Sequence, residues 1–130
     1  MKKKIKICIV RSKYNDTSQI LKSATAELMK KKIFVKILEG PGAFEIPVMI
    51  ARNINKFDGF VAIGSIIKGK TPNFEFISSS ITDGLMQLSI MNKKPIGNAI
   101  LTCLNEAQAR LRAKKGYEAV IAISEVLNVK

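Results

Sequence analysis

The chain has 130 residues, with 22 Lys or Arg, 10 Asp or Glu, two Cys, and neither His nor Trp. This length suits one domain, residues 1–130, with a core of its own. The 47% of hydrophobic residues excludes a disordered or fibrous chain. Without histidine, a Ser-His-Asp triad, an HExxH zinc site and an imidazole proton shuttle are all excluded.

The two cysteines and the N-terminal residues indicate the compartment. Cys8 and Cys103 lie in apolar stretches, which predicts core positions and not a disulfide framework. The apolar stretch after the basic start of the chain, residues 5–10, is only six residues long and contains Lys6, so it is too short for a signal peptide. No apolar run approaches the ~20 residues of a membrane span. We therefore expect a cytoplasmic protein without membrane contact.

The net charge of +12 raises the question of nucleic-acid binding. The basic residues are scattered at the ends and joints of the expected elements, in residues 2–4, 30–32, 93–94 and 110–115. No aromatic platform is interleaved with them. This pattern favours a solvated surface and an anionic small substrate, and it predicts no nucleic-acid partner.

The first half of the chain predicts two strands and two helices. Residues 4–10 alternate and then become apolar, which is typical of a strand. Candidate N-caps at 15–18 precede a helix whose shared face carries Ile20, Leu21, Ala24 and Leu28. Residues 33–38 predict a second strand, which Gly40-Pro41-Gly42 ends, and residues 43–54 predict a short helix.

The second half repeats this alternation. Residues 60–63 predict a compact strand that ends at Gly64, and Thr71-Pro72 is a favourable start for a helix. Residues 96–102 predict the fourth strand, and a last helix begins near Gly116. The buried stripes of these two helices are expected at Ile77, Ile81, Leu85 and Leu88, and at Ala119, Val120, Ile123, Val126 and Leu127.

Alternating strands and helices with nearly continuous apolar strands predict an α/β fold: a four-stranded parallel sheet covered by helices on both faces. Ligands of such sheets bind beyond the carboxyl ends of the strands. Those ends correspond to residues 11–15, 39–45, 64–71 and 102–105.

Residues 64–71 match the phosphate-loop pattern GxxxxGK[ST] between an expected strand and helix. A nucleotide hydrolase is therefore one alternative. Three features argue against it: the stiff Ser-Ile-Ile interior, the lack of a strand-end Asp for magnesium, and the short chain that follows. What remains is an anion site, in which Lys68, Lys70, Thr71 and the amides of a helix N-terminus could hold a phosphate.

Several segments at the strand ends resemble the lumazine synthase family, in order and over nearly the whole chain. They are Tyr14-Asn15, the heptapeptide PGAFEIP at 41–47, AIG at 62–64 with IKGKT at 67–71, ILT at 100–102 with NEAQA at 105–109, and KG at 115–116. The heptapeptide is by itself a specific signature of that family.

The resemblance implies condensation of 5-amino-6-(D-ribitylamino)uracil with 3,4-dihydroxy-2-butanone 4-phosphate. The products are 6,7-dimethyl-8-ribityllumazine, phosphate and water, formed without metal or organic cofactor. The resemblance further implies a flavodoxin-like three-layer sandwich and assembly into pentamers, or larger shells, with sites between subunits.

The resemblance also assigns roles to residues of this chain. Tyr14, with Asn15 beside it, would stack on the pyrimidine; Ala43, Phe44 and Glu45 would hold the ribityl chain; and Ser65, Ile66, Ile67 and Asn98 would contact the pyrimidine. Lys70, Thr71 and Arg112 would hold the phosphate.

Two departures from the family pattern stand out. The proton-donating histidine of the family is replaced by Asn73, whose amide cannot exchange a proton near neutral pH. The segment between Arg112 and Gly116 is shorter than in the family. Asn73 leaves open a second possibility, a non-catalytic relative that binds lumazine or flavin or only forms a shell.

Overall fold

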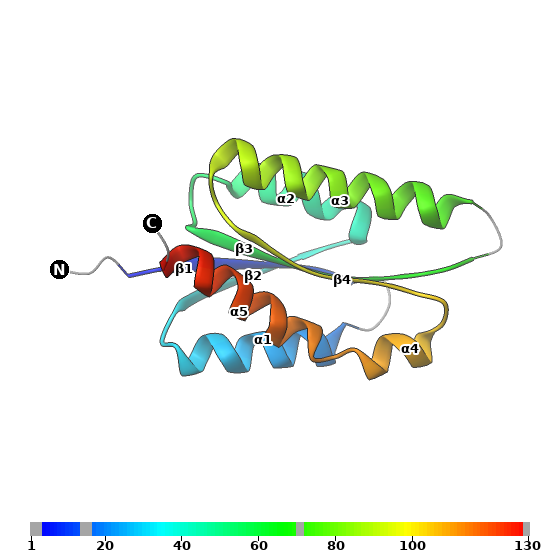
Figure 1. The fold of residues 1–130 in the computed structure, drawn as a ribbon, viewed down its shortest axis with the longest axis horizontal. Helices are drawn as coiled ribbons and strands as arrows, with labels where there is room; N and C mark the ends of the chain where they lie inside the picture. The colour runs from blue at the N-terminus through cyan, green and yellow to red at the C-terminus, as the bar shows by residue number, and fades with distance from the viewer. Residues whose placement is uncertain (1–3, 14–16, 70–71, 129–130) are drawn as a thin grey trace.

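A parallel four-stranded sheet forms the middle layer of the computed structural model, which describes residues 4–13, 17–69 and 72–128 (Figure 1). The strand order is β2-β1-β3-β4. The strands are β1 (Lys6–Ser12), β2 (Phe34–Gly40), β3 (Gly59–Ile67) and β4 (Ile96–Cys103). Each pair is parallel, so all carboxyl ends lie at one edge of the sheet.

Helices cover both faces of this sheet, as Figure 1 shows. One face carries α1 (Ser18–Lys30) and α5 (Lys115–Asn128). The other carries a 3₁₀ turn, η1 (Ala43–Glu45), with α2 (Ile46–Asn53) and α3 (Asn73–Asn92), while the short α4 (Glu106–Leu111) follows β4. The expected flavodoxin-like three-layer sandwich is confirmed. The strand order changes direction between β1 and β3, and folds of this kind bind ligands at that point.

Strand alternation divides the core between the two faces. Ile7, Ile9 and Ile63 pack toward α1 and α5, whereas Val10 and Phe60 pack toward α2 and α3. All five side chains are fully buried, and such burial contributes about 1.5–3 kcal/mol per side chain. The strands read as continuous apolar runs because both of their faces are covered.

Both cysteines are free and buried, as expected for core residues. Cys8 packs against the α2/α3 side and Cys103 against the α1/α5 side. Burial raises the pKa of the Cys8 thiol to about 11, with a smaller opposing effect of Lys36. This thiol therefore stays protonated near neutral pH and behaves as a small apolar group.

The structure corrects several of the expected boundaries. The third strand does not end at Gly64 but continues to Ile67, where it pairs with Cys103 of β4. The expected helix over 43–54 is divided into η1 and α2, and Val126, expected on the buried stripe of the last helix, is 57% exposed. Because residues 64–67 are strand, they do not form the loop that a nucleotide phosphate would need.

None of the helices in the described part of the chain is long and apolar enough to cross a membrane.

Candidate active site

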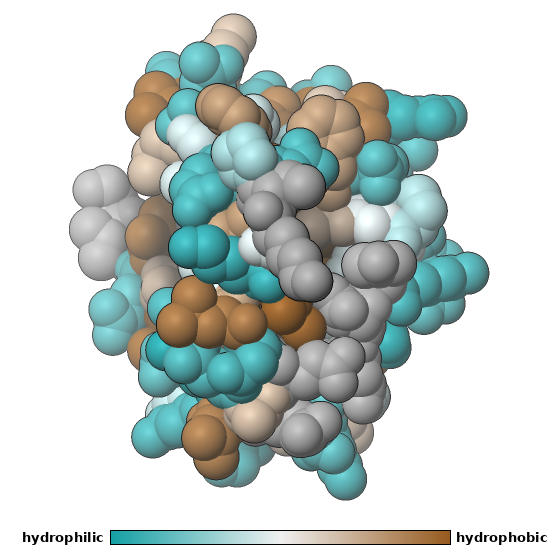
Figure 2. Space-filling model, turned by 90° about the vertical axis from the view of Figure 1, so that its right-hand side faces the viewer, coloured by the Kyte–Doolittle hydropathy of each residue, from teal (hydrophilic) through white to brown (hydrophobic). Residues whose placement is uncertain are grey.

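The carboxyl ends of the four strands bring most of the candidate residues to one end of the molecule. Figure 2 views this end, where hydrophobic and hydrophilic side chains lie side by side. The register places Arg11 beside Glu39 and Ile63, and Ile67 beside Cys103. The Arg11 and Glu39 side chains form an ion pair of 3.7 Å between Nε and Oε2.

The signature segment after β2 forms η1 and lies close against the sheet. The amide of Glu45 donates to the carbonyl of Gly42 at 3.3 Å, which closes the turn. A Cβ on Gly64 would lie 3.4 Å from the Cβ of Ala43 and 3.3 Å from Ser12 Oγ, so glycine lets η1 approach β3 closely. Ala43 and Glu45 are half-buried, while Phe44 projects outward with 60% of its surface exposed.

Two adjoining cavities open between η1, α2 and α3, and they share Phe44 and Ser80. The first, of about 400 Å³, is lined by Phe44, Glu45, Pro47, Val48, Ser80 and Ile81. The second, of about 310 Å³, is lined by Phe44, Asn73, Phe76, Ile77 and Ser80. The structure therefore brings Phe44, Glu45 and Asn73 together, although 28 residues separate the last two in the sequence.

Among the α3 residues of these cavities, Phe76 and Ser80 were not predicted from the sequence, and Ile77 and Ile81 were expected only as part of the buried stripe of this helix. Phe76 and Ile77 lie three and four residues after Asn73, and Ser80 and Ile81 lie seven and eight residues after it, which puts them on the same face of a helix. That spacing was the signal that could have found them. Pro47 and Val48 directly follow Phe44 and Glu45, and their place in α2 makes them part of the same wall.

Two basic residues, Lys68 and Arg112, lie at the ends of β3 and β4 and are called the basic corner below. The Lys68 amide donates to the Cys103 carbonyl at 2.9 Å, and Lys68 Nζ lies 3.7 Å from Glu75 Oε1 in the first turn of α3. Arg112 lies in the turn directly after α4, where its Nη1 is 4.0 Å from Cys103 Sγ. Lys68 and Arg112 thus both contact Cys103 at the end of β4, Lys68 through its backbone amide and Arg112 through its side chain on the α1/α5 face.

The remaining candidates in β3 and β4 are distributed over the sheet. Ser65 is buried, and strand alternation turns it and Ile67 to the α1/α5 side, whereas Ile66 turns to the α2/α3 side. Asn98 is exposed on the edge strand β4, where its Oδ1 accepts the amide of Ile100 at 3.0 Å. Asn98 pairs with Ala62 in mid-strand, so it lies away from the carboxyl ends.

Four candidates, Tyr14, Asn15, Lys70 and Thr71, lie outside the described residues. Within residues 4–13, 17–69 and 72–128, no three His, Cys, Asp or Glu side chains are placed together to hold a metal ion.

The chemistry that this end of the molecule offers has two parts. The cavities have apolar walls with a few polar groups, among them the Glu45 carboxylate and the Asn73 amide, which suits a small organic molecule that also offers hydrogen-bonding groups. At the same end of the sheet, the N-terminus of α3 and the Arg112 guanidinium offer positive charge for an anion, and Lys68 adds to it although its ammonium is paired with Glu75.

Comparison with known proteins places the chain in a family. The family model for 6,7-dimethyl-8-ribityllumazine synthase matches residues 4–130. The synthase of Leuconostoc mesenteroides is 35% identical over 136 residues, which covers 95% of this chain and 87% of the relative. The synthase of Cutibacterium acnes is 36% identical over 128 residues, which covers 91% of this chain and 77% of the relative.

One solved structure shares the fold at low sequence identity. It is a chain of a split-gene transketolase described as an inactive β4 tetramer, with a TM-score of 0.57 and 17% identity over 96% of this chain and 41% of the other. This likeness supports the architecture alone, whereas the family match covers the signature segment, both cavities and the basic corner. The chain belongs to the 6,7-dimethyl-8-ribityllumazine synthase family.

Proposed function

We propose that this protein condenses 5-amino-6-(D-ribitylamino)uracil with 3,4-dihydroxy-2-butanone 4-phosphate, forming 6,7-dimethyl-8-ribityllumazine in riboflavin biosynthesis. Membership of this transferase family carries the proposal. The juxtaposition of η1 with the first turn of α3, beside a basic corner, supports it because one substrate is a polyhydroxylated pyrimidine and the other a phosphate ester.

In the proposed reaction the chain holds two reactants so that an amine meets a ketone. Ala43, Phe44 and Glu45 would bind the ribityl chain, with the carboxylate accepting hydrogen bonds from its hydroxyls. The phosphate would bind at Arg112 with Lys70 and Thr71, and Lys68 would add to the positive field. Orientation of two reactants can supply 7–11 kcal/mol of the barrier, about twice the share of a general acid or base.

In the reaction an amine of one substrate and the ketone of the other form an imine with loss of water, phosphate is eliminated, and the second ring closes with loss of a second water. Protons would move through the substrate amine, the departing phosphate and water, since Asn73 cannot transfer one. Asn73 would donate or accept a hydrogen bond at the mouth of the second cavity. We therefore propose a working but slowed enzyme that needs no metal or organic cofactor.

The test is to mix the purified protein with both substrates and follow lumazine absorbance or fluorescence. Controls that omit one substrate or the protein measure the uncatalysed background. If no lumazine forms above background while lumazine or riboflavin binds in titration, the non-catalytic alternative that Asn73 favours replaces this proposal.

We further propose that the protein forms a homo-oligomer, a pentamer or a larger shell. Phe44, Val48 and Phe76, at 60%, 56% and 67% exposure, form an apolar surface around the two cavities. Asn98, assigned to the pyrimidine by the family resemblance, lies on an edge strand away from them. A second copy would cover the apolar surface and bring its own Asn98 to the site.

This assembly makes a direct prediction for the protein in solution. We expect light scattering at micromolar concentration to give at least five times the 14.3 kDa mass of the chain. Val48→Lys, which introduces charge on the apolar surface, should shift the mass downward, whereas Val126→Lys, at an equally exposed position on α5, should not. A monomeric wild-type protein would contradict both the assembly and the shared site.

The phosphate site makes a second prediction. We expect inorganic phosphate to bind with the same affinity with or without magnesium, because the proposed ligands are mainly cationic and the described part of the chain places no cluster of carboxylates to hold a metal. Calorimetry should show that Lys68→Gln weakens phosphate binding several-fold. Lys56→Gln should not, because Lys56 precedes β3 and so lies at the amino ends of the strands. Tight, magnesium-dependent ATP binding would instead support the phosphate-loop interpretation of residues 64–71.

A further inference from the structure

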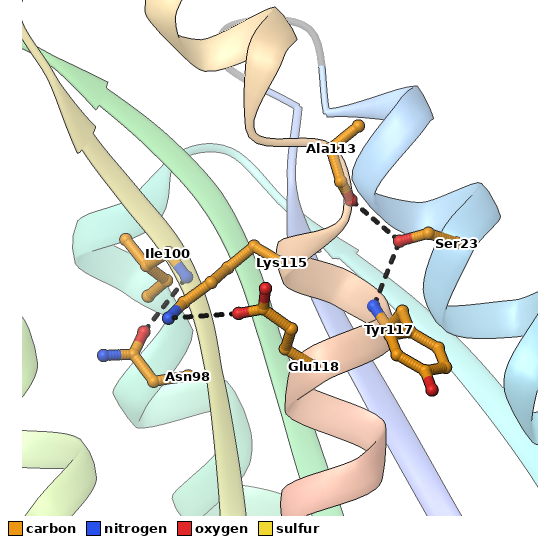
Figure 3. A network of polar contacts seen from close by, with 7 residues as sticks. All are labelled: Ser23, Asn98, Ile100, Ala113, Lys115, Tyr117 and Glu118. Atoms are coloured by element: carbon orange, nitrogen blue, oxygen red, sulfur yellow. Dashed lines mark hydrogen bonds and ion pairs between the residues drawn. The ribbon is translucent and has the colours of Figure 1, made fainter.

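The turn that carries Arg112 is fastened to α1 by one serine hydroxyl. Figure 3 shows Ser23 of α1 between Ala113 and Tyr117. Ser23 Oγ donates to the Ala113 carbonyl at 2.8 Å and accepts the Tyr117 amide at 3.1 Å. The carbonyl of Ile20, at 3.0 Å, is a second acceptor for the same hydroxyl. One side chain thus bonds both the turn after α4, at Ala113, and the first turn of α5, at Tyr117.

The backbone of the turn is braced by its own hydrogen bonds. The Lys115 amide donates to the Arg112 carbonyl at 3.0 Å, and the Gly116 amide donates to the Ala113 carbonyl at 3.4 Å. The Ala113 carbonyl therefore accepts from both the turn and α1. Arg112 directly precedes Ala113, whose carbonyl accepts these two hydrogen bonds. The Cα of Arg112 therefore has little freedom to move relative to α1.

Glycine at position 116 is what allows α1 to come so close. A Cβ on Gly116 would collide with the Ile20 carbonyl and lie 2.6 Å from Ser23 Oγ. This contact and the serine bonds join α1 to the start of α5 over about 90 residues of sequence. The turn between α4 and α5 is therefore held at a defined position on α1.

At the other end of its side chain, Arg112 meets β4. Its Nη1 lies 4.0 Å from Cys103 Sγ, and the carbonyl of the same cysteine accepts the Lys68 amide. A guanidinium carries five N–H groups, so one contact to sulfur leaves donors for an anion. The anchor at Ala113 thus decides where those donors lie relative to Cys103 and the end of β4.

We propose that Ser23 is a positioning residue for phosphate binding, acting through Arg112. The inference rests on the proposed function, because it assigns a phosphorylated substrate to the site of Arg112. Without the hydroxyl, the Ala113 carbonyl and the Tyr117 amide lose their bonds to α1. The guanidinium is then held less precisely, and bidentate binding of phosphate depends on that geometry.

The test measures inorganic phosphate binding by calorimetry and the two Michaelis constants on the full-length protein. We expect Ser23→Ala to raise the Kd of phosphate and the KM of the phosphorylated substrate about fivefold, the usual effect of one hydrogen bond. The KM of the pyrimidine substrate should change less than twofold. Thr25→Ala is the matched control, since the Thr25 hydroxyl bonds the Leu21 and Lys22 carbonyls of its own helix.

A double-mutant cycle separates positioning from general destabilisation. Arg112→Ala alone should weaken phosphate binding, and adding Ser23→Ala to it should weaken binding no further. Additive losses would overturn the inference, as would equal losses from Ser23→Ala and Thr25→Ala. Phosphate binding that follows this cycle in a protein forming no lumazine would support the inference while refuting the proposed function.

Discussion

Replacing Asn73 with histidine should raise kcat at pH 7 by tenfold to about a hundredfold and leave both KM values nearly unchanged. Asn73 begins α3 and lines the second cavity, whose other wall includes Phe44 of the segment assigned to the ribityl chain. Proton transfer helps the transition state and not the bound substrates, so the gain appears in kcat. General acid–base catalysis is typically worth ~10²–10⁴ in rate.

The pH dependence distinguishes a proton-transfer group from a merely better fit. We expect the N-terminus of α3 to keep the pKa of the new imidazole at or below its usual value of about 6.5. The rate of the variant should therefore gain a titration in that region which the wild type lacks. Asn73→Gln, which keeps an amide, is the control and should show no gain. An increase below tenfold for Asn73→His would mean that proton transfer does not limit the reaction.

Replacing Gly116 with alanine should destabilise the fold by about 3 kcal/mol, the upper part of the usual range for overpacking. The added methyl group collides with the backbone carbonyl of Ile20, which cannot rotate away as a flexible side chain can. Either α5 moves off α1 or the first turn of α5 distorts. Urea unfolding at equal protein concentration measures the loss, and the melting temperature should fall by roughly 10 °C.

Gly84→Ala is the matched control for this stability measurement. Gly84 lies within α3, and its Cβ would sit 3.5 Å from the Cβ of Pro47, an ordinary contact. Alanine in a helix interior is favoured over glycine by about 0.5–1 kcal/mol, so this variant should be slightly more stable than the wild type. A Gly116→Ala protein within 0.5 kcal/mol of wild type would show that α1 and α5 do not depend on this close contact.

The site could be predicted from sequence as far as its motifs reach. The PGAFEIP segment and the residues around Lys68 both lie at the strand ends where the sequence placed them. The cavity residues Phe76 and Ser80 were not identified: their helical spacing from Asn73 was a signal, but nothing local shows that η1 and α3 share a face of the sheet. Ser23 belongs to no sequence motif, and its hydrogen-bond partners Ala113 and Tyr117 lie about 90 residues away in the sequence.

The pattern of apolar residues by itself determined the layered α/β fold and most of the core, because strand and helix periods are local properties of the chain. Only the tertiary structure decided the strand order, the extension of β3 to Ile67 and the exposure of Val126. Each of these depends on which surfaces pack together. β3 continues to Ile67 because its backbone pairs with β4 as far as Cys103. Val126 is exposed because the neighbouring elements do not cover that side of α5.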